Sequence, residues 1–189
     1  MNHFLALRPN GATRDRLAAI AERLRAWDLP ASWLHPDDYH LTVRFLGPLD
    51  DDEVQLLPTL IDDVAASIRR PSLRLSGLGA TGTRGHGLAA VPRAVFAVVE
   101  DPEHACAGLH RDLGECLDEQ PLRDFLPHLT LCRPQPQAAT GQLFRDWPHL
   151  LEAHGLADWG PCTVDGLTLF RSGDYTPRYE TLSTWAVHG

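Results

Sequence analysis

One short pattern occurs twice in the chain, as His40-Leu41-Thr42-Val43 and again as His128-Leu129-Thr130-Leu131. Each copy is typical of a β-strand, because polar and apolar residues alternate with a period of two. Residues two apart in a strand point to the same face, so each histidine shares a face with its threonine. The copies lie nearly half the chain apart, which predicts two related lobes of strand and helix.

The first of these strands is predicted to run from His40 to Leu46 and to end at Gly47-Pro48. Strict alternation points Leu41, Val43 and Phe45 into the core. The same rule places Arg44 on the polar face with Thr42, where it could contact a phosphate.

In the second strand, alternation places Arg133 opposite His128. Pro134 follows at once and makes a strand end plausible there, because proline cannot donate to a sheet. The pattern alone therefore does not decide whether Arg133 lies on the same face of the strand as His128.

Two imidazoles and two hydroxyls in one cleft suit the chemistry of a phosphodiester. A neutral histidine can take a proton from water, and a protonated one can give a proton to the leaving oxygen, since free histidine titrates at about 6.5. Threonine hydroxyls can donate hydrogen bonds to the non-bridging phosphate oxygens. No metal or other cofactor is required. A single copy is common by chance, whereas two copies on two strands favour a shared site.

The rest of the chain alternates between strand-like and helix-like segments, which indicates an α+β or α/β protein. Three helices are expected. The first begins after an N-cap at Thr13, the second has its N-terminus at Asp50-Asp51-Asp52, and the third begins after Asp101. Pro58 falls inside the second of these and predicts a kink or a late start. Further strands are expected at 4–7, 32–34, 72–78, 94–99, 163–170 and 179–187, and a weak helix within 134–160.

Composition excludes several kinds of function. The 189 residues carry 17 basic and 25 acidic side chains, for a net charge of −8, and every basic residue is arginine. Chemistry that needs lysine is therefore excluded, including a P-loop or a Schiff base. An acidic chain without basic runs is not expected to bind an extended duplex. A cation at a phosphate must be arginine or protonated histidine.

The four cysteines show no CxxC pairing, which is typical of a reduced cytosolic chain. The apolar run at the N-terminus is too short for a signal peptide, and no segment is long and apolar enough to span a membrane. We therefore expect a cytoplasmic protein without a membrane partner. We also expect a monomer, although no sequence pattern bears on the oligomeric state.

The residues around both motifs closely resemble the two-histidine (2H) phosphoesterases, in particular the RNA 2′,3′-cyclic phosphodiesterase or 2′-5′ RNA ligase (LigT-like) family. The segment His40–Gly47 is similar to that family's HxTLxFLG, and Pro127–Arg133 to its PHxTLxR. Similar segments are also found at 4–7, 75–79, 92–96 and 167–172. The chain departs from the family at Asn2-His3, where arginine is common, and in the segments 82–87 and 135–160.

The resemblance implies an α+β fold with two antiparallel sheets lining a central cleft and helices outside. Residues 1–189 would form a single domain of two pseudo-twofold lobes, each contributing one motif. The implied activity is metal-independent hydrolysis of RNA 2′,3′-cyclic phosphate ends to 2′-phosphates, with 2′-5′ RNA ligation as the reverse reaction.

The resemblance also implies a role for each site residue. His40 would be the proton donor to the leaving O3′, and His128 the proton acceptor from water. Thr42 and Thr130 would hold the phosphate, and Arg133 would add a cationic contact.

Two alternatives stay open at this point. The same site could act on a small nucleotide, such as ADP-ribose cyclic phosphate or 2′-5′ oligoadenylate. A non-catalytic module that binds RNA ends is the other alternative, although both motifs are intact.

Overall fold

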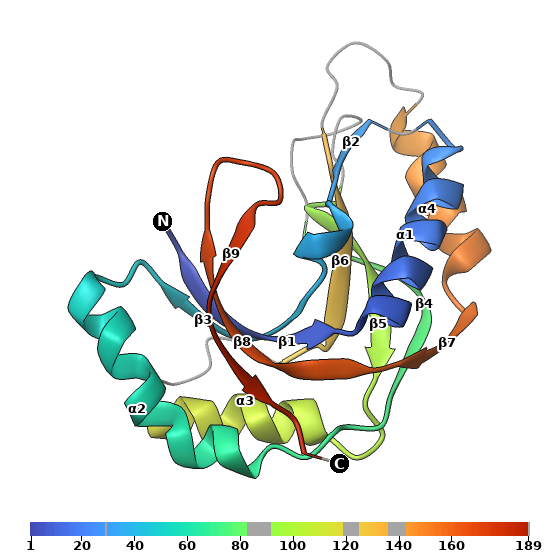
Figure 1. The fold of residues 1–189 in the computed structure, drawn as a ribbon. Coiled ribbons are helices and arrows are strands. Elements are labelled where there is room, and N and C mark those ends of the chain that lie inside the picture. The colour runs from blue at the N-terminus through green and yellow to red at the C-terminus, as the bar shows by residue number, and fades with distance from the viewer. Residues whose placement is uncertain (29, 83–91, 119–124, 136–142, 189) are drawn as a thin grey trace.

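The computed structural model describes residues 1–28, 30–82, 92–118, 125–135 and 143–188. Within these ranges the strands form two antiparallel sheets with helices around them, which confirms the expected α+β fold (Figure 1). The first sheet has the order β3 (Leu41–Gly47), β1 (His3–Pro9), β8 (Val164–Ser172) and β9 (Tyr179–Ala186). The second has the order β2 (Ala31–Trp33), β6 (His128–Pro134), β5 (Ala94–Glu100), β4 (Leu73–Thr81) and β7 (Asp158–Cys162).

The sheets do not coincide with the two halves of the chain. The short strand β2 from the N-terminal half pairs with β6, and β8 from the C-terminal half pairs with β1. Each sheet nevertheless carries one histidine motif, which spans the start of β3 in the first, with His40 directly before the strand, and lies on β6 in the second. These two motif strands are in contact across the sheets, so the topology brings both motifs to one region.

The helices are α1 (Gly11–Arg25), α2 (Asp51–Ser67), α3 (Ala105–Cys116) and α4 (Leu143–His154), with a short 3-10 helix η1 (Pro36–Asp38). Figure 1 shows α1 and α4 together on one side of the molecule and α2 and α3 along the bottom. No helix in the described residues is long and apolar enough to cross a membrane.

Helix α2 begins at Asp51, so of the two outcomes predicted from Pro58, a kink or a late start, the late start is wrong. Its N-terminus is fixed by a capping box in which Asp50 accepts from the Glu53 N–H and Glu53 accepts from the Asp50 N–H. Beyond Pro58, Ile61 is buried against the core, so packing holds the helix together past the proline.

The N-terminus of α1 also differs from the prediction, because the cap is Asn10. The Asn10 side chain accepts from the Thr13 N–H at 2.9 Å. Thr13 itself is buried, and its hydroxyl accepts from the N–H of Thr163 at 3.1 Å. The polar side chain of Thr13 therefore joins the helix to the C-terminal half of the chain.

The segment 134–160 was expected to be weakly helical, and α4 forms within it. It also contains the start of β7, which the sequence did not predict. Residues 158–162 include glycine and proline, which have low strand propensity. Pairing with β4 makes this segment a strand all the same.

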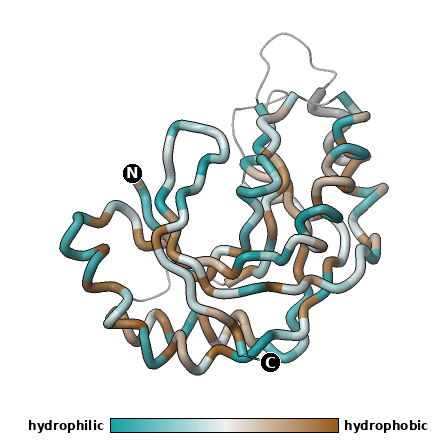
Figure 2. The backbone as a smooth tube through the Cα atoms, in the orientation of Figure 1, coloured by the Kyte–Doolittle hydropathy of each residue, from teal (hydrophilic) through white to brown (hydrophobic). Residues whose placement is uncertain are grey.

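A large core includes buried residues of both sheets, among them Leu5, Leu75 and Leu129. A smaller cluster of Phe4, Ala6 and Phe170 lies apart from that core, with Tyr179 packed against it. Alternation along β1 puts Phe4 and Ala6 on the opposite face of the first sheet from Leu5. Figure 2 shows that the tip of the hairpin from β8 to β9 is hydrophilic.

Candidate active site

Strand β3 contains a one-residue bulge directly after Thr42. Thr42 pairs with Ala6 of β1, and the next pair joins Arg44 to Leu5, so Val43 is the extra residue. Paired residues point to one face of a sheet, and a bulge reverses the alternation beyond it. Arg44 therefore lies on the core side with Leu5 and is only 4% exposed. The predicted placement of Arg44 beside Thr42 is wrong for this reason.

The same bulge moves Phe45 out of the core, where alternation had placed it. Phe45 pairs with Phe4, so it points to the face that carries the small aromatic cluster. Its side chain is 61% exposed. The polar face thus holds Thr42 and an exposed phenyl ring in place of Thr42 and a guanidinium.

Strand β6 also contains a one-residue bulge, directly after its own threonine. Thr130 pairs with Phe96 of β5, and the next pair joins Cys132 to Val95, so Leu131 is the extra residue. Cys132 is 0% exposed. Two adjacent apolar residues, Leu131 and Cys132, were the one sequence signal of this bulge.

Beyond the bulge, Arg133 returns to the face of His128, because alternation resumes one residue late. Strand β6 continues to Pro134, so the strand does not end before Arg133. Arg133 pairs with Ser32 of β2 and is half-buried. Arg133 and Phe45 therefore hold equivalent positions, each five residues after a motif histidine.

Each bulge has its extra carbonyl fixed by a hydrogen bond. The Val43 carbonyl accepts from Nδ1–H of His110 at 2.6 Å. The Leu131 carbonyl accepts from the Leu34 N–H at 3.0 Å. His110 comes from α3 and its ring stacks on Phe125 at 4.8 Å. Sequence reasoning missed this role of His110, since nothing in the motif marks a residue so far along the chain.

Both motif histidines are oriented in the same way. Nδ1 of His40 lies 2.7 Å from the Asp38 carbonyl, and Nδ1 of His128 lies 2.7 Å from the Leu126 carbonyl. A carbonyl oxygen can only accept, so Nδ1 carries the proton in each ring. Nε2 is then the atom of each histidine that can exchange a proton with a substrate.

Phenylalanine rings pack against both imidazoles. Phe4 lies 4.7 Å from the His40 ring, and Phe96 lies 4.7 Å from the His128 ring. His40 has a further edge contact with Tyr179 at 4.9 Å. The His40 ring therefore lies against two aromatic side chains.

Asp38 connects His40 to the C-terminal hairpin. While its carbonyl holds His40, its carboxylate accepts from the N–H of Arg178 at 2.9 Å and of Tyr179 at 3.0 Å. Asp38 is 4% exposed. The sequence indicated no role for Asp38, so its function in joining His40 to the hairpin was missed.

The pKa of His40 is lowered to about 4, chiefly by burial and in addition by positive charge on His128 and Arg133. The hydrogen bond to the Asp38 carbonyl acts in the opposite direction, because it stabilises the charged ring. His40 is thus neutral at pH 7 in the ligand-free protein. His128 and Arg133 are thus close enough to this ring to affect its charge state.

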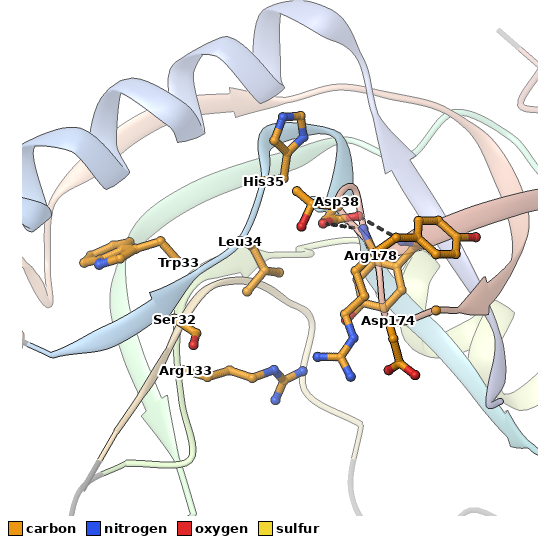
Figure 3. A pocket seen from close by; sticks show the side chains of 12 residues that line it. Ser32, Trp33, Leu34, His35, Asp38, Arg133, Asp174 and Arg178 are labelled. Atoms are coloured by element: carbon orange, nitrogen blue, oxygen red, sulfur yellow. Dashed lines mark hydrogen bonds between the residues drawn. The ribbon is translucent and has the colours of Figure 1, made fainter. Parts of the chain in front are cut away.

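A pocket of about 320 Å³ opens beside this site (Figure 3). Ser32 and Arg133 line it from the second sheet, and Asp38, Arg178 and Tyr179 line it from the side of His40. Of the segments that departed from the family pattern, residues 83–87 and 136–142 lie outside the described residues.

Comparison with known proteins agrees with the resemblance seen in the sequence. A family model described as LigT-like phosphoesterase matches residues 7–88, which include the first motif. An RNA 2′,3′-cyclic phosphodiesterase from Geobacillus stearothermophilus is 32% identical over 166 residues. The match covers 84% of this chain and 48% of that relative, so the chain spans about half the relative's length.

Solved structures show the same fold. The crystal structure of TT0787 from Thermus thermophilus has a TM-score of 0.72 and 22% identity, and covers 100% of this chain and 99% of that one. The crystal structure of E. coli LigT complexed with 3′-AMP has a TM-score of 0.62 and 24% identity, and covers 98% of this chain and 97% of that one.

Proposed function

The chain belongs to the LigT-like phosphoesterase family, and from that premise we propose that it hydrolyses 2′,3′-cyclic phosphate ends of RNA to 2′-phosphates without a metal ion. One observation carries the proposal. His40 directly precedes β3 and His128 begins β6, and these two strands contact each other. In each ring Nδ1–H donates to a carbonyl, so Nε2 is the atom that can exchange a proton with a substrate. In this proposal residues 1–189 act as one catalytic domain whose two lobes contribute one motif each.

The reaction needs one water molecule and two proton transfers. Nε2 of His128 takes a proton from water as the water oxygen attacks phosphorus. The bond from phosphorus to O3′ breaks, and Nε2–H of His40 gives its proton to O3′. Thr42 and Thr130, half-buried on the same faces as their histidines, donate hydrogen bonds to the non-bridging oxygens. The product carries a 2′-phosphate and a 3′-hydroxyl.

His40 must be protonated to act as the donor, whereas its pKa in the ligand-free protein is about 4. A bound phosphodiester brings a negative charge beside the ring and offsets the positive charges of His128 and Arg133. The pKa of His40 rises when that anion binds, so substrate binding and proton uptake are coupled.

Two further residues complete the proposed site. Arg133 lies on the face of His128 and supplies a guanidinium for the phosphate, which is the geometry that arginine suits best. Phe45, 61% exposed on the other motif strand, offers an apolar ring on which a base can stack.

The volume of the pocket favours a second candidate substrate. About 320 Å³ is within the usual range for a small-molecule site, so a small cyclic nucleotide could be turned over in place of an RNA end. The relative from E. coli was crystallised with 3′-AMP. In the reverse direction, the same residues would join a 2′,3′-cyclic phosphate end to a 5′-hydroxyl.

The test is to incubate an oligonucleotide bearing a 2′,3′-cyclic phosphate with the protein in EDTA and to identify the product end. We expect a 2′-phosphate at a rate that EDTA leaves unchanged. Inhibition by EDTA would contradict the metal-free mechanism. Tight end binding without turnover would leave only a binding module.

A further inference from the structure

We propose that the pocket beside the two histidines binds a second phosphate, the one attached to the 5′ oxygen of the nucleotide whose cyclic phosphate reacts. The inference rests on the proposed function, because it names a feature of that substrate. Three observations support it. Two arginines face each other in the pocket, hydrogen bonds hold the backbone that carries one of them, and the pocket adjoins the catalytic groups.

The two arginines come from different sheets. Arg133 lies on β6, and Arg178 lies just before β9. Figure 3 shows their guanidinium groups pointing toward one another in the pocket. Among the described residues neither guanidinium forms an ion pair with a carboxylate. Two like charges that face each other repel, and an anion between them turns that repulsion into attraction.

The carboxylates near the pocket do not supply that anion. Asp38 is buried, and its carboxylate is taken up by the N–H groups of Arg178 and Tyr179. Asp174 also lines the pocket, but it is exposed and pairs with no arginine in the described part of the chain. A phosphate, with oxygens for both guanidiniums, fits the pair better than either carboxylate.

The backbone that carries Arg178 is fixed before any ligand binds. Its N–H donates to the Asp38 carboxylate at 2.9 Å, and its carbonyl accepts from the Gly173 N–H at 2.8 Å. Little backbone ordering therefore remains to oppose binding, and the side chain of Arg178 is the part that an anion would order.

The pocket continues directly from the catalytic groups. Tyr179 lines it and contacts the His40 ring at 4.9 Å, while Arg133 shares the face of His128. A nucleotide whose cyclic phosphate lies between the histidines can therefore extend its 5′ side into this pocket. The phosphate there could be the phosphodiester of an RNA chain or the 5′-phosphate of a small nucleotide.

The experiment measures binding, so that it is independent of turnover. Calorimetry compares adenosine 2′-phosphate with adenosine 2′,5′-bisphosphate, and with an adenylyl dinucleotide that ends in a 2′-phosphate. We expect at least one of the two 5′-phosphorylated ligands to bind the wild type about ten-fold or more tightly than adenosine 2′-phosphate. In Arg178→Gln that ratio falls to near one. The ligand whose affinity depends more on Arg178 identifies the source of the second phosphate. The dinucleotide would indicate an RNA chain, and the bisphosphate would indicate a small nucleotide.

Arg111→Gln is the matched control, because Arg111 is an exposed arginine on α3 that pairs with Asp112 away from the pocket. It should keep the wild-type ratio. Equal affinities of the wild type for all three ligands would overturn the inference, as would a ratio that Arg178→Gln leaves unchanged. Should Arg178→Gln fail to fold, Arg133→Gln takes its place, with the same expected fall in the ratio. Loss of turnover alone, with the ratio intact, would count against the proposed function and not against this site.

Discussion

Replacing Asp38 with alanine should destabilise the protein far more than the same change at its neighbour Asp37. The Asp38 carboxylate accepts two backbone N–H groups, at 2.9 and 3.0 Å, and the residue is 4% exposed. Alanine would leave the N–H groups of Arg178 and Tyr179 without an acceptor. An unsatisfied buried donor costs about 1–3 kcal/mol, so two partly buried donors should cost about 2–4 kcal/mol.

The assay is urea denaturation of the wild type, Asp38→Ala and Asp37→Ala, with the free energy of unfolding taken from linear extrapolation. Asp37 is the matched control: its side chain is 53% exposed and lies 3.6 Å from Arg14 in a surface ion pair. Exposed pairs contribute about 0–1 kcal/mol, so Asp37→Ala should stay within about 1 kcal/mol of the wild type.

Asp38→Ala should also lower kcat, because the hairpin that presents Tyr179 to the His40 ring loses its anchor. The Asp38 carbonyl is kept in the variant, so the Nδ1 bond of His40 is not removed directly. Equal stability of the two alanine variants would refute the assignment of Asp38 as the anchor of this hairpin.

Three further changes should give measurable effects. The pKa of His40 is about 4 in the folded protein against about 6.5 unfolded, so the unfolded state binds the proton first and stability falls as the pH drops from 6.5 to 4. That loss, up to about 3 kcal/mol, should be absent from the denaturation profile of His40→Gln, and an unchanged profile would contradict the assignment. Phe45→Ala should change stability by less than about 1 kcal/mol, since the ring is exposed, yet raise KM for nucleotide substrates about 5- to 100-fold through lost stacking; an unchanged KM would remove Phe45 from the site. His110→Ala should cost about 1–3 kcal/mol in urea denaturation, because the Val43 carbonyl loses its donor and Phe125 its stacking partner, and a neutral effect would show that the bulge does not need His110.

The sequence predicted the fold class and both motif strands, because alternation and turn residues are local signals. It also placed each histidine with its threonine, since His40, Thr42 and their counterparts precede the bulges. The prediction failed at Arg44 and Phe45, where one extra residue reverses the faces. A bulge depends on pairing with β1, and the partner strand cannot be read from the segment that contains it.

Residues that act across long sequence distances were also beyond the sequence pattern. Asp38 received no role from the sequence, although its carboxylate accepts from the backbone N–H of Arg178, far along the chain. His110 donates to the Val43 carbonyl on β3 from helix α3, which is also far along the chain. Alternation alone did not decide on which face of the strand Arg133 lies. The bulge at Leu131 explains why its side chain is on the face of His128.

The central claim is that His40 and His128 act on one phosphorus as donor and acceptor of protons. The most direct test compares His40→Ala and His128→Ala on two substrates, an RNA 2′,3′-cyclic phosphate and an activated aryl phosphodiester whose leaving group needs no proton. On the cyclic phosphate both variants should be slowed by about 10²–10⁴. On the aryl ester His40→Ala should keep most of the wild-type rate, while His128→Ala should stay slow. Equal losses for both variants on both substrates, or wild-type turnover by either variant on the cyclic phosphate, would contradict the account.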